Sequence, residues 1–414
     1  MTAAVAIVFA AVYLGMIAGA LPWLQLDRTG IALLGAIAIV GLGALTPEQA
    51  ALSIHLPTLL LLFAFMVVSA QLRLGGFYTW VTRRVAELPL TPPALLAVLI
   101  AIMAALSAIF SNDIVCLAAA PVLARICFHR GLDPLPFVLA LACAANVGSA
   151  ATLIGNPQNM LIGAALAIDF AAYAGIALPV VVPGLVATWG WIAWRSRGRW
   201  QLPQTQAPEA PGRRLDDDMP FDAWQTAKGL CVAAVLLALF VWSAIPREVA
   251  ALTGAGLLLM SRRLHSTRML GLVDWELLVL FIGLFVVNRA FQDTGLVAQA
   301  VTHLGSIGIA LERPAELFIA SFALSNVVSN VPAVMLLLPL ATDPLAGPIL
   351  ALASTLAGNL LIVGSIANII VVDAAAKQGV RIDWRTHARV GIPVTITTLA
   401  IAAAGLALQA RGIS

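Results

Sequence analysis

The sequence has little charge. Lys, Arg, Asp and Glu make up 10% of its 414 residues, and the formal net charge is only +3. A soluble domain carries about 25% charged residues, and a nucleic-acid-binding domain needs a strongly basic surface. The composition therefore excludes an ordinary soluble domain and gives no support for a nucleic-acid partner. Apolar residues take the place of charge: 61% are hydrophobic and the mean hydropathy is +0.98, which indicates an integral membrane protein.

Residues that build metal centres and disulfide frameworks are also scarce. The four cysteines lie in apolar segments and no two of them have CxxC spacing, which argues against a disulfide framework or a thiolate metal site. No cluster of His, Cys and Glu falls at the expected membrane depth, so an enzyme is the weakest interpretation and no cofactor is expected. No Lys or Arg precedes the first apolar run, so we expect a first spanning helix there rather than a cleaved signal peptide.

The apolar runs predict an all-α integral membrane protein of about ten transmembrane helices, since each crossing takes about 20 residues. One such run, 56–82, is expected to be a single span. Paired apolar arms at 93–130 and 313–342 meet at polar turns and predict two opposed re-entrant hairpins. Runs 134–169 and 347–377 are interrupted by Gly and Asn clusters and predict broken helices, which are tolerated where protein or a water-filled cavity satisfies the backbone.

These elements form two predicted repeats, 1–195 and 224–414, joined by a proline-rich, charged connector at 196–223. The connector is predicted to be a flexible cytoplasmic linker. Each repeat holds five spans and one hairpin, and an odd number of spans inverts the second repeat. Nearly all Lys and Arg residues then fall inside or at the cytoplasmic boundary, as the positive-inside rule requires. We therefore expect both termini outside the cytoplasm.

The two hairpin turns carry nearly the same motif. Ser111-Asn112-Asp113 recurs as Ser329-Asn330-Val331, and Gly155 to Asn159 recurs as Gly364 to Asn368. Polar, helix-breaking clusters repeated within apolar halves are typical of a transporter's binding site. The predicted substrate- or ion-binding residues are Ser111, Asn112, Asp113, Asn146, Thr152, Gly155, Asn156 and Asn159 in the first repeat, and Asn326, Ser329, Asn330, Asn359, Gly364, Ser365 and Asn368 in the second.

Short polar side chains and freed carbonyls at these turns can coordinate a small ion or hydrogen-bond an oxyanion. Two plainer interpretations stand beside this one. Ser and Asn are favoured helix caps, and Gly and Asn clusters can serve only close helix packing. No Lys or Arg lies inside either motif, so the substrate is either neutral or a small anion held by amides and helix dipoles.

Asp113 has no acidic counterpart, because Val331 occupies the equivalent place. An ionisable carboxylate in the bilayer core is costly and marks a functional residue by default. Asp113 is therefore the candidate proton or cation carrier, with a neutral or helix-capping Asp as the alternative. Cys116 is a candidate thiol contact for a metalloid, although a buried Cys is more often an inert small hydrophobe.

On these motifs the chain resembles the ion transporter superfamily, which includes arsenite efflux permeases, sodium/proton antiporters and divalent-anion/sodium symporters. The resemblance covers essentially the whole chain. The symporters have Ser-Asn-Thr at each hairpin tip, whereas the arsenite permeases have an Asn-Asp pair at the first tip, as Asn112-Asp113 do here. The resemblance implies efflux of arsenite, antimonite or a related small oxyacid, coupled to the proton gradient, with Asp113 as the coupling residue.

Two other transport functions stay open. One is a sodium-coupled symporter of dicarboxylates, citrate or inorganic anions, and the other is a sodium/proton antiporter, which would require more intramembrane acids than Asp113. The coupling ion is expected to be a proton, with sodium as the alternative. The expected location is a bacterial-type inner or plasma membrane. The expected partners are the lipid bilayer, a small oxyacid or anion, and, by resemblance, an arsenite ATPase or a second copy of the chain.

Overall fold

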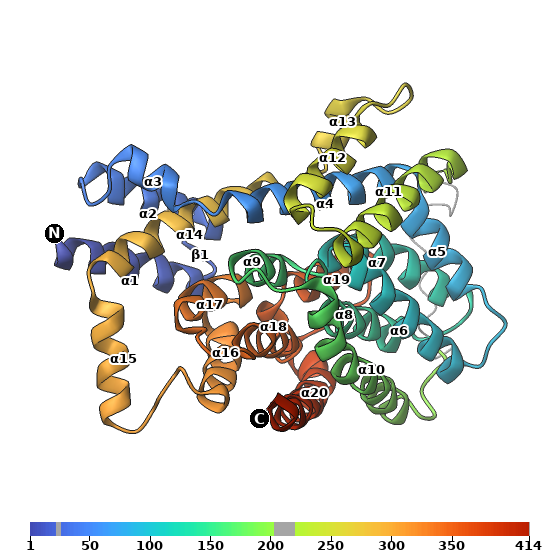
Figure 1. The fold of residues 1–414 in the computed structure, drawn as a ribbon. Helices are drawn as coiled ribbons and strands as arrows, with labels where there is room; N and C mark the ends of the chain where they lie inside the picture. Colours follow the sequence, from blue (N-terminus) through green and yellow to red (C-terminus); the bar gives the residue numbers. More distant parts are fainter. Residues whose placement is uncertain (22–25, 203–219, 414) are drawn as a thin grey trace.

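The computed structural model describes residues 1–21, 26–202 and 220–413, and these are mostly helical (Figure 1). The first half comprises α1 (Thr2–Ala18), β1 (Ala20–Leu21), β2 (Leu26–Asp27), α2 (Arg28–Gly41), α3 (Pro47–Ser53), α4 (Leu56–Leu74), α5 (Phe77–Ala86), α6 (Pro92–Ile109), α7 (Asn112–His129), α8 (Pro134–Ser149), α9 (Pro157–Ala165) and α10 (Phe170–Arg195). The second half comprises α11 (Ala223–Trp242), α12 (Arg247–Leu259), α13 (Ser266–Leu270), α14 (Trp275–Asp293), α15 (Leu296–Ser306), α16 (Pro314–Val328), α17 (Asn330–Leu337), η3 (Leu338–Leu340), α18 (Ala346–Ala357), η4 (Ile362–Gly364), α19 (Ile366–Lys377) and α20 (Trp384–Ile413). The two short strands pair antiparallel.

Seven of the described helices are long and apolar enough to cross a membrane. They are α4, α6, α7, α10, α11, α14 and α20. Shorter apolar helices accompany them, including α1, α2, α8, α16 and α18. The all-α membrane architecture is confirmed: α6–α7 and α16–α17 are the two hairpins, and α8–α9 and α18–α19 are the two broken helices.

The helices after the connector recur in the order of those before it. Equivalent helices of the two halves make reciprocal contacts with the other half. α4 packs against α12 of the second half, and α14 packs against α2 of the first. α10 and α20, the last helices of the two halves, pack against each other, while α5 and α15 lie at opposite ends of the molecule (Figure 1). These reciprocal contacts are what an inverted repeat produces. The predicted boundaries 1–195 and 224–414 stay a prediction, and most of the linker, 203–219, lies outside the described residues.

The expectation of one span over 56–82 is wrong. α4 ends at Leu74 and α5 begins at Phe77, with Gly76 at φ 70° between them. The second half breaks at the same place, where Gly295 has φ 74° between α14 and α15. Glycine adopts this left-handed conformation without the steric cost of a Cβ atom. Gly75-Gly76 was the available signal, but the apolar residues on both sides of it made 56–82 resemble a single span.

Close packing of α6 on α8 fixes the first hairpin to the first broken helix. A Cβ atom built on Gly148 of α8 would lie 2.4 Å from the Cα atom and 2.5 Å from the carbonyl oxygen of Ala104 on α6. Both neighbours are backbone atoms that cannot turn aside, so the two helices touch only because residue 148 has no side chain.

We expect Gly148→Ala to force α6 and α8 apart and to lower the melting temperature of the purified protein, because overpacking costs about 1–3 kcal/mol. The matched control is Gly175→Ala on α10, where a Cβ atom would meet nothing within 4 Å. Thermal unfolding followed by fluorescence measures both. Equal melting temperatures for the two variants would contradict the packing described here.

Candidate functional site

The two broken helices each leave a gap in the regular backbone. α8 ends at Ser149 and α9 begins at Pro157, while α18 ends at Ala357 and α19 begins at Ile366. Helix ends leave N–H and C=O groups without intrahelical partners. No bulk water reaches the hydrocarbon region to satisfy them, so side chains must do so.

Asn159 and Asn368 close these gaps in the same way. The Nδ2 group of Asn159 donates to the carbonyl oxygen of Thr152 (3.0 Å). The Nδ2 group of Asn368 donates to the carbonyl oxygens of Leu361 (3.1 Å) and Gly358 (2.7 Å). Both side chains are fully buried. Thr152 and Leu361 hold equivalent places in the repeat, so the sequence repeat extends to individual hydrogen bonds.

Asn146 of α8 joins the two halves at the centre of the molecule. Its Nδ2 group donates to Oδ1 of Asn359 (2.9 Å) and Oδ1 of Asn368 (3.0 Å). Its Oδ1 atom accepts from Oγ of Ser365 (2.9 Å). Four residues from the predicted set are therefore held in one buried network across the two halves.

Thr355 of α18 makes the reciprocal connection. Its Oγ1 hydroxyl donates to Oδ1 of Asn159 (3.3 Å) and accepts from Nδ2 of Asn156 (3.1 Å) and Nε2 of Gln158 (3.2 Å). The sequence prediction missed Thr355. It stands where Asn146 stands in the first repeat, at the offset that relates the two Gly-to-Asn motifs, so the alignment of the motifs was the signal that could have found it.

The last helix of each half holds the end of α8 or α18. The Tyr173 hydroxyl of α10 donates to the carbonyl oxygen of Ala150 (2.8 Å). Nε2 of His387 on α20 lies 3.0 Å from the carbonyl oxygen of Asn359. Because a carbonyl can only accept, this nitrogen carries the proton. Neither Tyr173 nor His387 was predicted, since each lies in an apolar helix outside the repeated motifs.

The first hairpin tip is hydrogen-bonded to the first broken helix, at the place where the two broken helices meet. The Asn112 backbone N–H donates to the carbonyl oxygen of Gly155 (3.2 Å), and its Nδ2 group donates to Oδ1 of Asn146 (3.1 Å). Oγ1 of Thr152 donates to the carbonyl oxygen of Ala108 at the end of α6. These bonds connect both arms of the hairpin to the first broken helix.

The serine residues at the two tips do not act as helix caps. Ser111 and Ser329 occupy the N-cap positions of α7 and α17, yet neither side chain makes a capping hydrogen bond within the described structure. Their backbones differ. Ser111 has φ −53° and ψ 128°, whereas Ser329 has φ 79° and ψ 161°, a conformation that belongs almost exclusively to glycine and costs about 1–3 kcal/mol in other residues. The second tip is therefore strained and the first is relaxed.

Asp113 lies in the first turn of α7 and is partly buried. Its backbone N–H is hydrogen-bonded to Oδ1 of Asn112 (3.1 Å); within the described residues its carboxylate has no hydrogen bond or ion pair. Cys116, one turn further along α7, is a fully buried free thiol. The described part of the chain contains no group of three or more His, Cys, Asp or Glu residues that could hold a metal ion.

The second tip leaves polar atoms unpaired. Four of the buried atoms that find no hydrogen-bond partner among the described residues belong to the second hairpin and the adjoining break: Ser325 Oγ, Asn326 Oδ1, Asn330 Oδ1 and Asn359 Nδ2. The two hairpin asparagines lie against the break between α18 and α19, since a Cβ atom on Gly364 would be 3.3 Å from Asn326 Oδ1, and one on Gly358 would be 3.4 Å from Asn330 Nδ2. Buried polar atoms without partners are uncommon in native proteins, so this cluster marks where a polar ligand can bind.

Broken helices that cross between two opposed hairpin tips, with unpaired polar groups beside the crossing, define the centre of a secondary transporter. The family model described as "CitMHS: Citrate transporter" matches residues 5–357. The chain belongs to this family of multi-pass membrane transporters.

Curated relatives agree with this class. An uncharacterized transporter of Mycobacterium tuberculosis is 28% identical, over 93% of this chain and 94% of that protein. The silicon efflux transporter LSI3 of Oryza sativa subsp. japonica is 27% identical, over 92% of each chain. The putative transporter arsB of Dictyostelium discoideum is 22% identical, over 91% of this chain and 87% of that protein.

The fold is also similar to that of a solved transporter. The crystal structure of the Alcanivorax borkumensis YdaH transporter, described as having an unusual topology, covers 98% of both chains with a TM-score of 0.57 and 14% sequence identity. At this identity the likeness concerns the fold alone.

Two asparagines of the second half should respond differently to truncation. Asn368→Ala removes donors from two buried carbonyl groups, each costing about 1–3 kcal/mol when left unpaired, and should lower the melting temperature clearly. Asn330→Ala removes an amide whose Oδ1 atom has no partner, and should leave the melting temperature almost unchanged. A larger loss for Asn330→Ala in the same thermal assay would show that we have reversed the two roles.

Replacing the serines with glycine tests the strain at the second tip. Ser329→Gly should raise the stability by about 1 kcal/mol or more, because glycine adopts φ 79° freely. Ser111→Gly should lower the stability by about 0.5–1 kcal/mol. Ser111 has no backbone strain for glycine to relieve, and glycine increases the conformational entropy of the unfolded chain. The two melting temperatures, measured side by side, should move in opposite directions.

Proposed function

We propose that the protein exports small uncharged oxyacids, such as arsenite, antimonite or silicic acid in their undissociated forms, in exchange for protons. The observation that carries the proposal is the set of unpaired neutral atoms at the second hairpin tip. Hydroxyl and carboxamide groups supply all of them, and no Lys or Arg takes part in the cluster.

The chemistry of these atoms favours a ligand rich in hydroxyl groups. The Oδ1 atoms of Asn326 and Asn330 can only accept hydrogen bonds, so their ligand must donate. The orientation of Asn326 is fixed because its Nδ2 group donates to the carbonyl oxygen of Phe322 (3.0 Å). An undissociated oxyacid offers several O–H donors, whereas the carboxylates of citrate offer only acceptors. A trivalent anion would also leave its charge uncompensated at membrane depth.

Asp113 supplies a proton-binding group on the opposite tip. Its carboxylate is partly buried and has no basic partner among the described residues, so the carboxylate can take up and release a proton without first breaking an ion pair. Exchange of protons for oxyacid follows if the binding site changes sides of the membrane either when Asp113 is protonated or when an oxyacid is bound. This role remains part of the proposal, as do the predicted thiol contact of Cys116, the external termini and the arsenite ATPase or second copy as a partner.

A second candidate is a sodium-coupled citrate or dicarboxylate symporter. The description of the matching family model supports citrate as the substrate, and sodium is the alternative coupling ion expected from the sequence. The names of two relatives favour the first candidate, since one is a silicon efflux transporter and the other a putative arsB transporter. The second tip offers the acceptor oxygens of Asn326 and Asn330, the donor group of Asn359 and the hydroxyl of Ser325, with no cationic side chain in the cluster. Oxyacid hydroxyls both donate and accept, which is the reason we place oxyacid export first.

Purified protein in liposomes with an acidic interior should accumulate radioactive arsenite, or germanic acid as an analogue of silicic acid. Accumulation should collapse with a protonophore and should be indifferent to sodium. Asn330→Ala should lower the initial rate at least tenfold, because the substitution removes the hydrogen bond between the substrate and Oδ1 of Asn330, and the loss of such a bond costs about 1.4 kcal/mol or more. Sodium-dependent uptake of citrate, without oxyacid transport, would refute the proposal in favour of the symporter.

Asp113→Asn should abolish proton-driven accumulation while leaving exchange of labelled for unlabelled oxyacid across the membrane. Asp169→Asn is the control, because Asp169 caps α10 through the N–H of Ala172 (2.7 Å) and Asn caps equally well. Full accumulation by Asp113→Asn, with a normal dependence on the proton gradient, would remove Asp113 from the coupling mechanism.

A further inference from the structure

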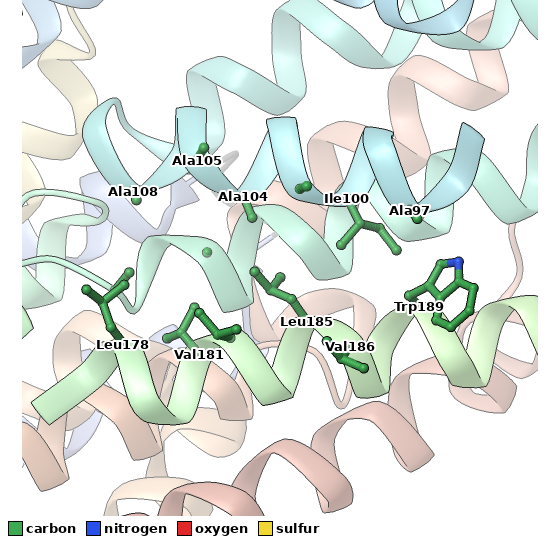
Figure 2. A pocket seen from close by; sticks show the side chains of 14 residues that line it. Ala97, Ile100, Ala104, Ala105, Ala108, Leu178, Val181, Leu185, Val186 and Trp189 are labelled. Carbon is green, nitrogen blue, oxygen red and sulfur yellow. The ribbon is translucent and has the colours of Figure 1, made fainter. Parts of the chain in front are cut away.

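An apolar groove runs along the outer face of the first half, between α6 and α10, with the end of α8 as its floor (Figure 2). Its volume is about 550 Å³. The alanine side chains of α6, among them Ala97, Ala101 and Ala105, leave the space that the larger side chains of α10 do not fill. The groove extends along α10 from Leu178 to Trp189, which at 1.5 Å per residue is about 16 Å.

Trp189 closes one end of the groove. Its indole Nε1 group donates to the carbonyl oxygen of Pro93 (2.9 Å), at the start of α6. A tryptophan at this place is typical of the boundary between hydrocarbon and headgroups. The distance from this boundary to the middle of a bilayer is about 15 Å, so the groove has the length of one lipid leaflet.

A basic pocket of about 170 Å³ lies beyond Trp189, where α8, α10 and α20 meet. On α10, the last residue that lines the groove, Trp189, lies three residues before Ile192, the first residue of this helix that lines the pocket. Three arginines line the pocket: Arg195, Arg199 and Arg389. Arg195 ends α10, Arg199 lies four residues further along the chain, and Arg389 belongs to α20.

The pocket keeps an excess of positive charge. Its one acidic lining residue, Asp133, caps α8 through the N–H of Leu135 (3.0 Å). Burial raises the pKa of Asp133, while that hydrogen bond and the nearby Arg199 lower it. Outside the pocket, Asp383 caps α20 and lies near Arg389. Within the described residues Arg195 and Arg389 have no ion pair.

We propose that this groove and pocket bind one anionic phospholipid, with an acyl chain in the groove and the phosphate between Arg195, Arg199 and Arg389. Basic pockets between membrane helices bind anionic headgroups, and the adjoining groove supplies the apolar contact that a soluble anion could not use. The related groove of the second half, between α16, α18 and α20, is about 420 Å³. It begins at Pro314, beside Arg313, whose guanidinium is paired with Glu316 (3.8 Å), so we place the lipid in the first groove only.

Native mass spectrometry of the full-length protein in neutral detergent tests the proposal with dioleoylphosphatidylglycerol as the probe. One molecule should bind at least tenfold more tightly than dioleoylphosphatidylcholine, which has the same chains and no net charge. Arg195→Gln and Arg389→Gln should each weaken binding about fivefold. Arg197→Gln is the charge-matched control on the same segment and outside the pocket lining, and it should bind as the wild type does.

A matched pair of substitutions tests the apolar groove of the proposed lipid site. Ala101→Phe fills the first groove and should weaken binding, whereas Ala407→Phe fills the related groove of the second half and should not. Inorganic phosphate at the same concentration should not compete. Equal binding of the two lipids, competition by phosphate, or equal losses for Arg195→Gln and Arg197→Gln would each overturn the proposal.

Discussion

The structure depends on how the backbone hydrogen-bonding groups of the broken helices find partners at membrane depth. Breaking a helix releases backbone carbonyls that water cannot reach. At each break, a single asparagine carboxamide donates hydrogen bonds to the released carbonyl groups. The Nδ2 groups of Asn159 and Asn368 close their own repeat, while their Oδ1 atoms accept from Thr355 and Asn146 of the other repeat. Each local repair is therefore also a contact between the repeats, and the hairpins and last helices assemble around that crossing.

Much of this could be predicted from the sequence. Low charge and long apolar runs give the class, and Gly and Asn clusters within those runs locate the hairpins and broken helices. Individual partners could not be predicted, because the central hydrogen bonds join residues 196 to 222 positions apart. His387 was missed for this reason, because its importance comes from what lies opposite it and it stands outside the repeated motifs. Thr355 could have been found, because it occupies the place of Asn146 at the offset that relates the two motifs.

The difference between the hairpin tips was also beyond the sequence. Ser-Asn stands at both tips, but the backbone of one serine is relaxed and that of the other is strained. The motif specifies short polar side chains at a turn; the packing of the arms decides their dihedral angles. As a result, the Asn112 carboxamide at the first tip is used within the protein, while several polar groups at the second tip remain available to a ligand.

The fastening of the first tip has an energetic consequence. Two identical inverted repeats could exchange conformations to give inward- and outward-open states of equal free energy. Here three hydrogen bonds hold Asn112 and Thr152 to the neighbouring elements, and the equivalent residues Asn330 and Leu361 make no such bonds within the described structure. At about 1 kcal/mol for each bond, the two states would differ roughly 100-fold in population. The empty carrier would therefore have a preferred resting orientation, set by sequence divergence between its halves.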